Sequence, residues 1–148
     1  MDKKFIDLKT NLKYIEQYIE LRNQYSELLL TKKVNYKETL EWLKNNDIEI
    51  YGIVEDDILK GVIILYINKG NEITFFVKEK QKGYGTILLK YMEEIAIKKN
   101  IKQLYAWVLK KNIIAAKVFE KNGYKETGST IKIFNGKKYK GYIYKKNL

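Results

Sequence analysis

The sequence predicts one α/β (α+β-like) domain over residues 1–148, with a mixed central sheet of about seven strands. Three observations predict this class. Short β-rich runs separated by turns over 48–77 indicate an antiparallel meander. A strand, a glycine turn, an amphipathic helix and another strand follow over 72–109, the pattern of a parallel crossover. The last two β-rich runs flank Asn135-Gly136, a strong hairpin signal because both central residues of a type I′ turn need positive φ.

The N-terminal part predicts one strand and two helices. Residues 4–8 alternate weakly, as in a short strand. Asn35 starts the second helix, because Glu38 stands three positions on in capping-box spacing. Asn11 is the candidate cap of the first helix, and the polar run 22–24 is its end. The apolar stripe of this helix consists of Leu12, Ile15 and Ile19, widened by Tyr14, Tyr18 and Leu21.

The middle of the chain predicts a three-stranded meander at 48–54, 58–67 and 72–77. The helix after the glycine turn has one apolar and one charged face. Residues 102–109 predict the next strand, parallel to the strand at 72–77 because a helix connects the two. The apolar face of that helix consists of Leu88, Tyr91, Met92 and Ile95, and its charged residues Lys90, Glu93, Glu94 and Lys98 point away.

The C-terminal part predicts a helix followed by a hairpin. Asn112 caps the helix at 113–121, and Asn122-Gly123 ends it. Strands at 129–134 and 138–144 form the hairpin. The complete predicted order is β-α-α-β-β-β-α-β-α-β-β.

The glycine turn at 83–85 is the feature that predicts binding. The first turn of a helix attracts anions because its N–H groups are unpaired and its peptide dipoles are aligned. Glycine lets an anion approach the main chain and tolerates the φ angles of such a loop. A P-loop would need a Lys-Ser/Thr pair after Gly85, and a dinucleotide fingerprint would need glycine in place of Leu88, so neither motif is present.

The composition excludes several kinds of chemistry. The chain has no cysteine and no histidine, so disulfides, thiolate zinc sites, cysteine nucleophiles and serine–histidine dyads are excluded. A metal site would need carboxylates alone, and we predict none because the sequence holds no dense Asp/Glu cluster. These limits favour a reaction without a covalent enzyme intermediate, such as direct attack of an amine on a thioester.

The formal charge of +11 suits a polyanionic partner, either a nucleotide-bearing cofactor or a nucleic acid. The lysines are spread over the whole chain, which also fits a plain bias of composition. Residues 1–8 contain two lysines with no apolar segment behind them, and the longest apolar run, 62–67, is far shorter than a membrane span needs. We therefore expect a soluble, cytoplasmic protein with no membrane partner.

Two motifs resemble those of the GCN5-related N-acetyltransferase (GNAT) family. Residues 80–85 resemble its coenzyme A loop, Gln/Arg-x-x-Gly-x-Gly/Ala, except that Lys80 stands at the first position. Residues 112–124 resemble its Asn-x-x-Ala-x-x-x-Tyr-Glu-Lys-x-Gly-Phe signature, with Phe119 in place of tyrosine and Tyr124 in place of the last phenylalanine. The order of elements is also similar, and the match from 48 to 124 covers about half of the chain.

The resemblance implies the GNAT fold and an acetyl-CoA-dependent N-acetyltransferase without a metal, in which a primary amine attacks directly in a ternary complex. The sheet would splay between its fourth and fifth strands, so that the fourth strand's main chain binds the pantetheine arm. One N–H near Phe76 or Val77 would stabilise the oxyanion. The residues that bind the cofactor would be Phe75, Phe76, Val77, Lys80, Gln81, Lys82, Gly83, Tyr84, Gly85, Thr86, Asn112, Ala115 and Phe119.

Glu72 is the candidate general base, because an amine of pKa ~10 must lose a proton before it attacks. Strand alternation places it on one face with Thr74 and Phe76. The alternative is a solvated or ion-paired carboxylate at the end of a strand. The tyrosine that usually protonates the leaving thiolate is Phe119 here. The proton would then come from another tyrosine such as Tyr84 or Tyr124, or from water, or the thiolate would leave without one.

The acceptor is predicted only by a further resemblance. Arg22 and Asn23, with the second helix ending at 40–43, resemble the branch that acetylates nucleotide-linked amino sugars, including enzymes of pseudaminic acid assembly. A basic site suits such a diphosphate. The alternatives are a protein N-terminus, an amino acid, an antibiotic or another small amine.

Two other classes stay open at this stage. A basic nucleic-acid-binding module could use Tyr139, Tyr142 and Tyr144, although no RNA-binding motif is present. A coenzyme A-binding module without catalysis would fit the departures at Lys80 and Phe119. The sequence leaves open whether the protein forms a homodimer.

Overall fold

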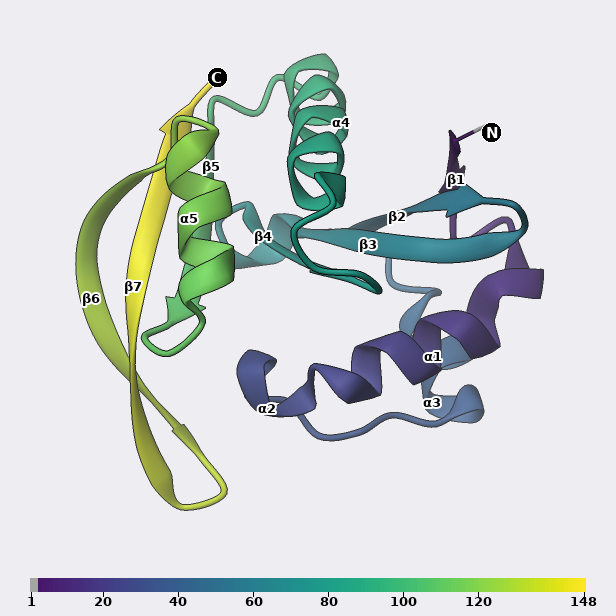
Figure 1. The fold of residues 1–148 in the computed structure, drawn as a ribbon, viewed down its shortest axis with the longest axis horizontal. Helices are drawn as coiled ribbons and strands as arrows, with labels where there is room; N and C mark the ends of the chain where they lie inside the picture. The colour runs from purple at the N-terminus through teal and green to yellow at the C-terminus, as the bar shows by residue number, and fades with distance from the viewer. Residues whose placement is uncertain (1–2) are drawn as a thin grey trace.

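The computed structural model describes residues 3–148, which form a seven-stranded mixed sheet in the order β1-β2-β3-β4-β5-β7-β6 (Figure 1). The predicted fold class and order of elements are confirmed, with one short helix, α2, added. The strands are β1 (Lys3–Asp7), β2 (Ile48–Glu55), β3 (Ile58–Tyr66), β4 (Glu72–Val77), β5 (Gln103–Leu109), β6 (Lys125–Phe134) and β7 (Lys137–Asn147). The helices are α1 (Ile15–Gln24), α2 (Ser26–Leu29), α3 (Tyr36–Trp42), α4 (Tyr84–Lys98) and α5 (Ile113–Lys121), with the 3-10 turns η1 (Leu12–Tyr14) and η2 (Ile67–Lys69).

The helices divide between the two faces of the sheet (Figure 1). Helices α4 and α5 cover one face, where Leu88 of α4 and Ile63 of β3 belong to one buried cluster. Helices α1 and α3 cover the other face, where Tyr18 of α1 packs against Phe76 of β4 with ring centroids 6.0 Å apart. Since successive side chains on a strand point to opposite faces, Phe75 lies on the α4–α5 side. Strand β4 thus contributes to both cores.

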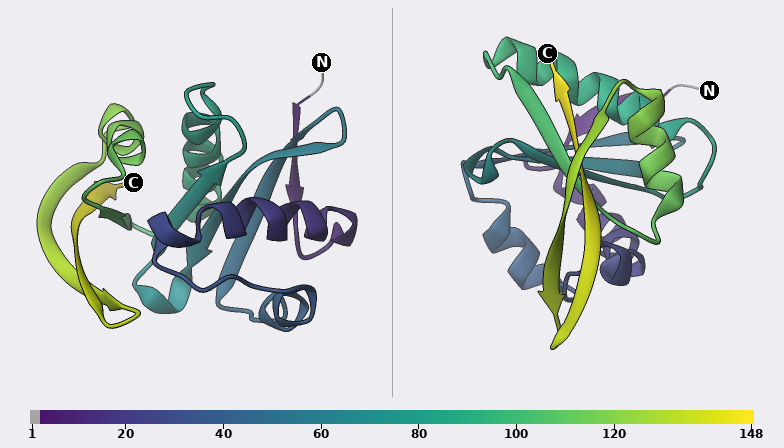
Figure 2. Two further views of the ribbon diagram at one scale, coloured as in Figure 1. Left: turned by 60° about the horizontal axis from the view of Figure 1, so that its bottom comes forward. Right: turned by 90° about the vertical axis from the view of Figure 1, so that its left-hand side faces the viewer.

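Strands β4 and β5 run parallel but diverge, as the resemblance implies. Among residues 3–148 they share a single registered pair, Glu72 opposite Tyr105. Tyr105 N donates to Asn71 O at 3.3 Å there. Beyond this pair the strands part, and the β6–β7 hairpin curves away from the plane of β2, β3 and β4 (Figure 2). The sheet therefore has an open seam between its two halves.

The C-terminal hairpin is longer than the sequence predicts, but its turn is the predicted one. Asn135 and Gly136 have φ values of 51° and 76°, as a type I′ turn requires. In the middle of β7, Gly141 leaves room for the indole of Trp107 from β5. A Cβ on Gly141 would lie 2.1 Å from two ring atoms of that indole.

Two details of the N-terminal helix differ from expectation. The Asn11 side chain does not cap a helix; its Nδ2 instead donates to Asp7 O at 2.8 Å, because the turn η1 intervenes before α1. Leu12 is 51% exposed, so the buried stripe is centred on Tyr14, Ile15, Tyr18 and Leu21. The predicted cap of α3 is confirmed, since Asn35 Oδ1 accepts from Glu38 N at 2.8 Å.

The prediction that Glu93 of α4 points away from the protein is wrong. Glu93 does not point away from the protein but accepts hydrogen bonds from Tyr124 (2.8 Å) and from Lys146 Nζ (3.0 Å). The reason is that the C-terminal strands cover this side of α4, which periodicity within the helix alone does not reveal.

Candidate functional site

The seam between β4 and β5 contains a cavity of about 140 Å³, which we call the seam cavity. Side chains from both faces of the sheet line it: Phe119 and Asn112 come from the α5 side, whereas Glu72 and Thr74 come from the α1 side. A ligand in this cavity would therefore pass through the sheet. Its lining includes seven of the residues that the sequence predicts for the site: Arg22, Glu72, Phe75, Phe76, Asn112, Ala115 and Phe119.

The main chain of β4 presents polar groups to this seam. Lys78 N donates to Lys60 O of β3 at 2.8 Å, so the alternation of an antiparallel ladder directs the N–H and C=O of Phe76 toward β3 as well. The groups of Phe75 and Val77 then face β5. Tyr25 Oη donates to Val77 O at 2.7 Å, which leaves the N–H of Val77 and both groups of Phe75 directed into the seam. Of the two residues predicted for the oxyanion contact, Val77 has the suitable orientation and Phe76 does not.

The edge of β5 that faces β4 also presents main-chain polar groups to the seam. Lys110 N donates to Lys140 O at 3.0 Å, so alternation directs the main-chain groups of Trp107 and Leu109 away from β7 and toward β4. Leu109 O accepts from Asn112 N at 2.8 Å, which ties this edge to the start of α5. Both edges of the seam therefore offer main-chain hydrogen-bonding groups outside the two ladders.

The glycine turn leads from β4 directly into α4. Gly83 is the residue before the helix and has a left-handed φ of 84°, and no atom lies within 4 Å of the position that a Cβ would take. Gln81 also has a positive φ, 61°. The first turn of α4 carries no acidic residue, and the three lysines 78, 80 and 82 stand just before it. The loop thus combines open space, unpaired amides and positive charge, which fits a phosphate.

Gly85 and Thr86 have packing roles in addition to their place in the motif. A Cβ on Gly85 would lie 2.9 Å from Phe75 and 3.2 Å from Val118, so glycine is required here for contact between α4, β4 and α5. Thr86 Oγ1 accepts from Asn122 Nδ2 at 3.0 Å, which joins α4 to the end of α5. The sequence motif therefore also encodes how the two helices meet.

Phe119 lies at the centre of an aromatic cluster beside the seam. It is 2% exposed and packs against Phe75, Tyr124 and Tyr144, with ring centroids 5.3, 5.1 and 6.0 Å apart. Asn112 Oδ1 accepts from Ala115 N at 3.3 Å, as predicted for the cap of α5. The α5 wall of the seam cavity therefore combines the aromatic ring of Phe119 with the capping residue Asn112.

Glu72 lies at the point where the seam opens. Its side chain is 17% exposed, and Glu72 Oε2 lies 3.8 Å from Lys132 Nζ of β6. Lys132 also stands over the Trp107 ring, 4.4 Å from its centroid. Tyr66 is directly opposite Glu72 in the β3–β4 register. Burial raises the pKa of Tyr66 to about 12, with Arg22 opposing the rise and the Glu72 carboxylate adding to it.

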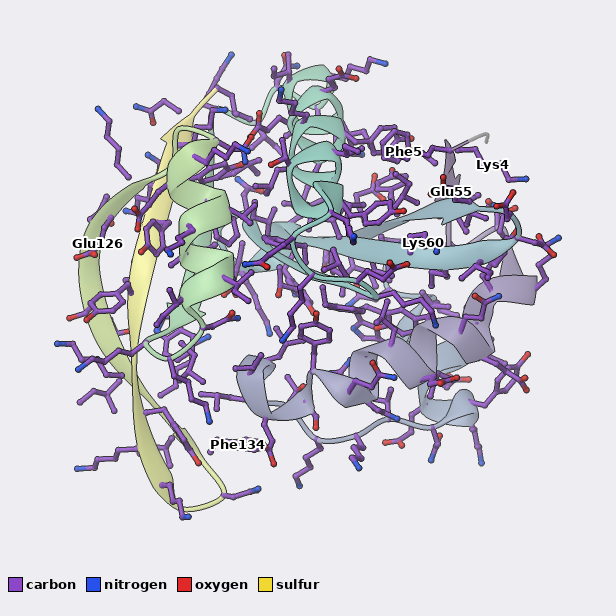
Figure 3. The ribbon with its side chains drawn as sticks, in the orientation of Figure 1. Lys4, Phe5, Glu55, Lys60, Glu126 and Phe134 are labelled. Atoms are coloured by element: carbon purple, nitrogen blue, oxygen red, sulfur yellow. The ribbon has the colours of Figure 1, made fainter. Side chains whose placement is uncertain are left out.

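The two tyrosines predicted as sources of a proton lie elsewhere. Tyr84 Oη donates to the buried Glu55 Oε1 at 2.7 Å, at the end of β2 beside β1 (Figure 3). This hydrogen bond, with burial, raises the pKa of Tyr84 to about 12. Burial, with the charge of Glu93, raises the pKa of Tyr124 far above its ordinary value. Neither residue lines the seam cavity, where Tyr66 is the one tyrosine in the described part of the chain.

Arg22 and Asn23 are adjacent in sequence, but they have different structural roles. Arg22 lines the seam cavity and a second cavity of about 300 Å³ between α1, α3 and β3, which we call the side cavity. Asn23 lines neither. Its side chain donates to Val34 O at 3.0 Å and accepts from Val34 N at 2.9 Å, so it fastens the segment between α2 and α3.

Several residues of the site have no motif in the sequence. Trp107 was predictable as a site residue. Alternation on β5 directs its side chain to the other face of the sheet from the buried Leu104, Ala106 and Val108. Thr31, Tyr66 and Lys132 gave no local signal, because the folded chain alone brings them to the cavity. Tyr25, which binds the carbonyl of Val77, gave none either.

Residues 3–148 hold no group of three or more metal-ligating side chains. They also hold no helix with the length and apolar character needed to cross a membrane.

Comparison with known proteins gives a consistent result. The model of the acetyltransferase (GNAT) family matches residues 15–124. No match was found among curated proteins. Among solved structures, the fold is similar to an N-acetyltransferase from Staphylococcus aureus Mu50 (TM-score 0.85, 14% identity, 99% of each chain covered). It is also similar to a ribosomal-protein-alanine N-acetyltransferase from Brucella melitensis (TM-score 0.84, 14% identity, 100% of each chain). A third structure, provisionally described as a phosphinothricin N-acetyltransferase, has a TM-score of 0.81, 22% identity and 99% coverage of each chain.

Proposed function

This chain belongs to the acetyltransferase (GNAT) family, and we propose that it transfers the acetyl group of acetyl-CoA to the primary amine of a small molecule in a ternary complex. The observation that carries the proposal is the open seam, in which β4 and β5 share one registered pair and enclose a cavity lined from both faces of the sheet. When bound, acetyl-CoA supplies an activated thioester carbonyl. The chain supplies position, hydrogen bonds and a route for the proton.

The donor would bind along β4 and at the start of α4. The outward-facing groups of Phe75 and Val77 would bind a pantetheine arm as an added strand does. The amides of residues 82–86 would bind the phosphates, and the open space beside Gly83 fits their approach. The N–H of Val77 would stabilise negative charge on the carbonyl oxygen. Exposed lysines such as Lys80 add little each.

Glu72 would accept the proton of the attacking amine. Glu72 lines the seam cavity on the α1 side, and an acceptor would approach it past Arg22 and Tyr66, which line both cavities. Lys132 of β6 is the ion-pair partner of the Glu72 carboxylate. The ion pair is long at 3.8 Å, so the carboxylate keeps capacity for a further hydrogen bond.

The leaving thiolate needs no tyrosine in this arrangement. A thiol has an ordinary pKa of about 8.5, so its anion is only slightly basic at neutral pH and water can protonate it after release. Phe119 would then serve as an apolar wall for the pantetheine arm, consistent with its place among Phe75, Tyr124 and Tyr144. Replacement of the family's usual tyrosine is thereby compatible with catalysis.

The size of the cavities favours a small acceptor. The seam and side cavities measure about 140 and 300 Å³ and share Arg22 and Tyr66. A nucleotide-linked amino sugar stays the candidate that the sequence suggests, and its diphosphate suits a basic site. A protein N-terminus is the second candidate. Homodimer formation and a cytoplasmic location stay predictions.

A thermal-shift assay with acetyl-CoA, coenzyme A and a short oligonucleotide tests the proposal first. A ligand at 100 times its Kd stabilises a protein by about 2.7 kcal/mol. We expect a shift with both coenzymes and none with the oligonucleotide, followed by thiol release when acetyl-CoA is mixed with an amine library. Stabilisation by the oligonucleotide alone would favour a nucleic-acid-binding module. Binding of coenzyme A without thiol release from any amine would favour a module without catalysis.

A further inference from the structure

Arg22 is the only arginine among the 29 basic residues of the chain, and it lines both cavities. Its guanidinium donates one hydrogen bond, from Nη1 to Lys32 O at 3.2 Å. Among residues 3–148 no carboxylate lies within ion-pair distance of it. A guanidinium has five N–H donors in a planar fork that matches a carboxylate or phosphate. Most of this capacity is therefore available to a ligand.

Thr31 contributes a second unused group at the same cavity. Its hydroxyl oxygen is buried and lacks a hydrogen-bond partner, and it is the one such side-chain atom in the described residues. A buried polar atom without a partner is unfavourable, so its retention in a cavity wall points to a ligand that supplies the partner. Thr31 lines the seam cavity together with Arg22.

The segment that follows α2 links these two groups. Thr31 precedes Lys32, whose carbonyl accepts the hydrogen bond from Arg22. Helix α2 ends at Leu30 in the left-handed conformation, φ 52° and ψ 50°, and Thr31 N then donates to Ser26 O at 2.9 Å. The turn is thus closed by hydrogen bonds on both sides of Thr31.

Glu72 and Tyr66 line the same cavity as Arg22 and Thr31. Tyr66 stands opposite Glu72 in the β3–β4 register and lines the side cavity with Arg22. The side cavity has aromatic walls, where the rings of Tyr18 and Trp42 stack 6.2 Å apart. A ligand that reaches both cavities would therefore meet a carboxylate, a cation, a hydroxyl and the aromatic rings of the side cavity.

We propose that Arg22 and Thr31 form an oxyanion subsite, so that the acceptor is a small amine that also carries a carboxylate or a phosphate. The proposal rests on the proposed function, because Glu72 receives the proton of the same acceptor's amine. Arg22 binds the oxyanion through its planar fork, and the Thr31 hydroxyl donates a hydrogen bond to it. The shared chemistry is a compact oxyanion on the amine-bearing molecule, either an amino acid carboxylate or a sugar phosphate.

Matched pairs of acceptors test the subsite. We would measure kcat/KM for L-phenylalanine against 2-phenylethylamine, L-leucine against 3-methylbutylamine, and glucosamine 1-phosphate against glucosamine. Hydrogen bonds to a buried charged group correspond to roughly 10-fold or more in affinity, so one anionic member should exceed its neutral partner by about that factor. The pair that shows the preference identifies the source of the oxyanion.

Variants then assign the preference to residues. Arg22→Gln should reduce the preference for the anionic member to within about threefold of unity, and Thr31→Val should reduce it partly. Lys33→Gln is the matched control, since it removes the same charge from an exposed residue outside both cavities, and it should leave the preference unchanged. Equal use of anionic and neutral amines by the unmodified protein, or a preference that survives Arg22→Gln, would overturn the proposal.

A binding measurement separates the subsite from the reaction. 3-Phenylpropionate and glucose 1-phosphate carry the oxyanion without an amine, so neither can be acetylated on nitrogen. One of them should raise the melting temperature of the unmodified protein in the presence of coenzyme A, and Arg22→Gln should remove the shift. That result without acetylation of any amine would refute the proposed function and keep the subsite. Acetylation of neutral amines with no oxyanion binding would refute the subsite and keep the proposed function.

Discussion

Glu72 of β4 and Tyr105 of β5 are the one registered pair that joins the two halves of the sheet within residues 3–148. Glu72 is therefore the residue at which the seam begins. Its side chain lies on the α1 face, where the side cavity opens, and the main-chain groups of Phe75 and Val77 follow along the seam. The candidate base and the candidate donor-binding edge thus belong to one short strand of six residues.

Gly83→Ala tests the role of the glycine turn. Alanine disfavours the left-handed φ of 84°, by about 1 kcal/mol, and relief of this strain would shift the amides at the start of α4. We expect the affinity for coenzyme A to fall roughly 10-fold, as measured by calorimetry. Gly136→Ala is the control, because its φ of 76° lies in a distant hairpin turn with equally open surroundings. Equal affinities in the two variants would contradict a phosphate site at Gly83.

Glu72→Gln tests the base. We expect kcat/KM to fall about 100-fold or more at neutral pH, because a positioned general base contributes at least that much. The deficit should be greatest at low pH and should shrink toward pH ~10, where the free amine no longer needs a base. The measurement is the pH–rate profile of both proteins.

The control for Glu72 is Glu49→Gln. Glu49 is also a strand carboxylate, 20% exposed and paired with Lys99 at 2.8 Å, but it lines neither cavity. Its variant should retain the activity of the unmodified protein. A profile of unchanged shape in Glu72→Gln would remove Glu72 from the mechanism.

Gly141→Ala should destabilise the protein because its Cβ would overlap the Trp107 indole. Overpacking of this kind costs about 1–3 kcal/mol of unfolding free energy, which urea denaturation followed by tryptophan fluorescence would measure. Gly128→Ala is the control on the neighbouring strand, since its Cβ would meet nothing within 4 Å. Similar stabilities of the two variants would show that Trp107 does not occupy the space over β7.

Tyr84 should make the stability sensitive to alkaline pH. Its folded-state pKa is about 12, against an ordinary value of 10, so the folded and unfolded chains both keep the proton below pH 10. Between pH 10 and 12 the unfolded chain loses this proton first, and stability falls by up to about 1.4 kcal/mol per pH unit from this group.

Tyr84→Phe should make that decline less steep. The variant should also be less stable at neutral pH, because Glu55, 8% exposed, loses its hydrogen-bond donor. Urea denaturation from pH 7 to pH 12 measures both effects. An unchanged pH slope would mean that Tyr84 titrates normally in the folded protein.

The order of elements was predictable because its signals are local. The caps at Asn35 and Asn112, the stop at Gly123 and the turn at Asn135-Gly136 each depend on a few neighbouring residues. The extra helix α2 and the burial of Glu93 were not predictable in this way. Helix α2 is a single turn of four residues without a buried side chain, so it has no apolar stripe that would reveal it. The burial of Glu93 depends on how the C-terminal strands cover α4, and periodicity within one helix carries no such information.

The site was predictable in part for the same reason. Motif spacing placed Phe119 and Asn112 beside the seam, and the face of β4 placed Glu72 there. Whether Phe76 or Val77 directs its N–H into the seam depends on the register with β3, which the sequence does not contain. The separate roles of Arg22 and Asn23 depend on contacts with Lys32 and Val34 across a turn.

Amide hydrogen exchange resolved by residue tests the central claim, that the free edge of β4 receives the acyl donor. In the free protein we expect slow exchange at Thr74 and Phe76, which face β3, and fast exchange at Phe75 and Val77, which face the seam. Acetyl-CoA should slow exchange at Phe75 and Val77 in particular. Slow exchange at all four amides in the free protein, or no change at Phe75 and Val77 when acetyl-CoA is added, would contradict the account.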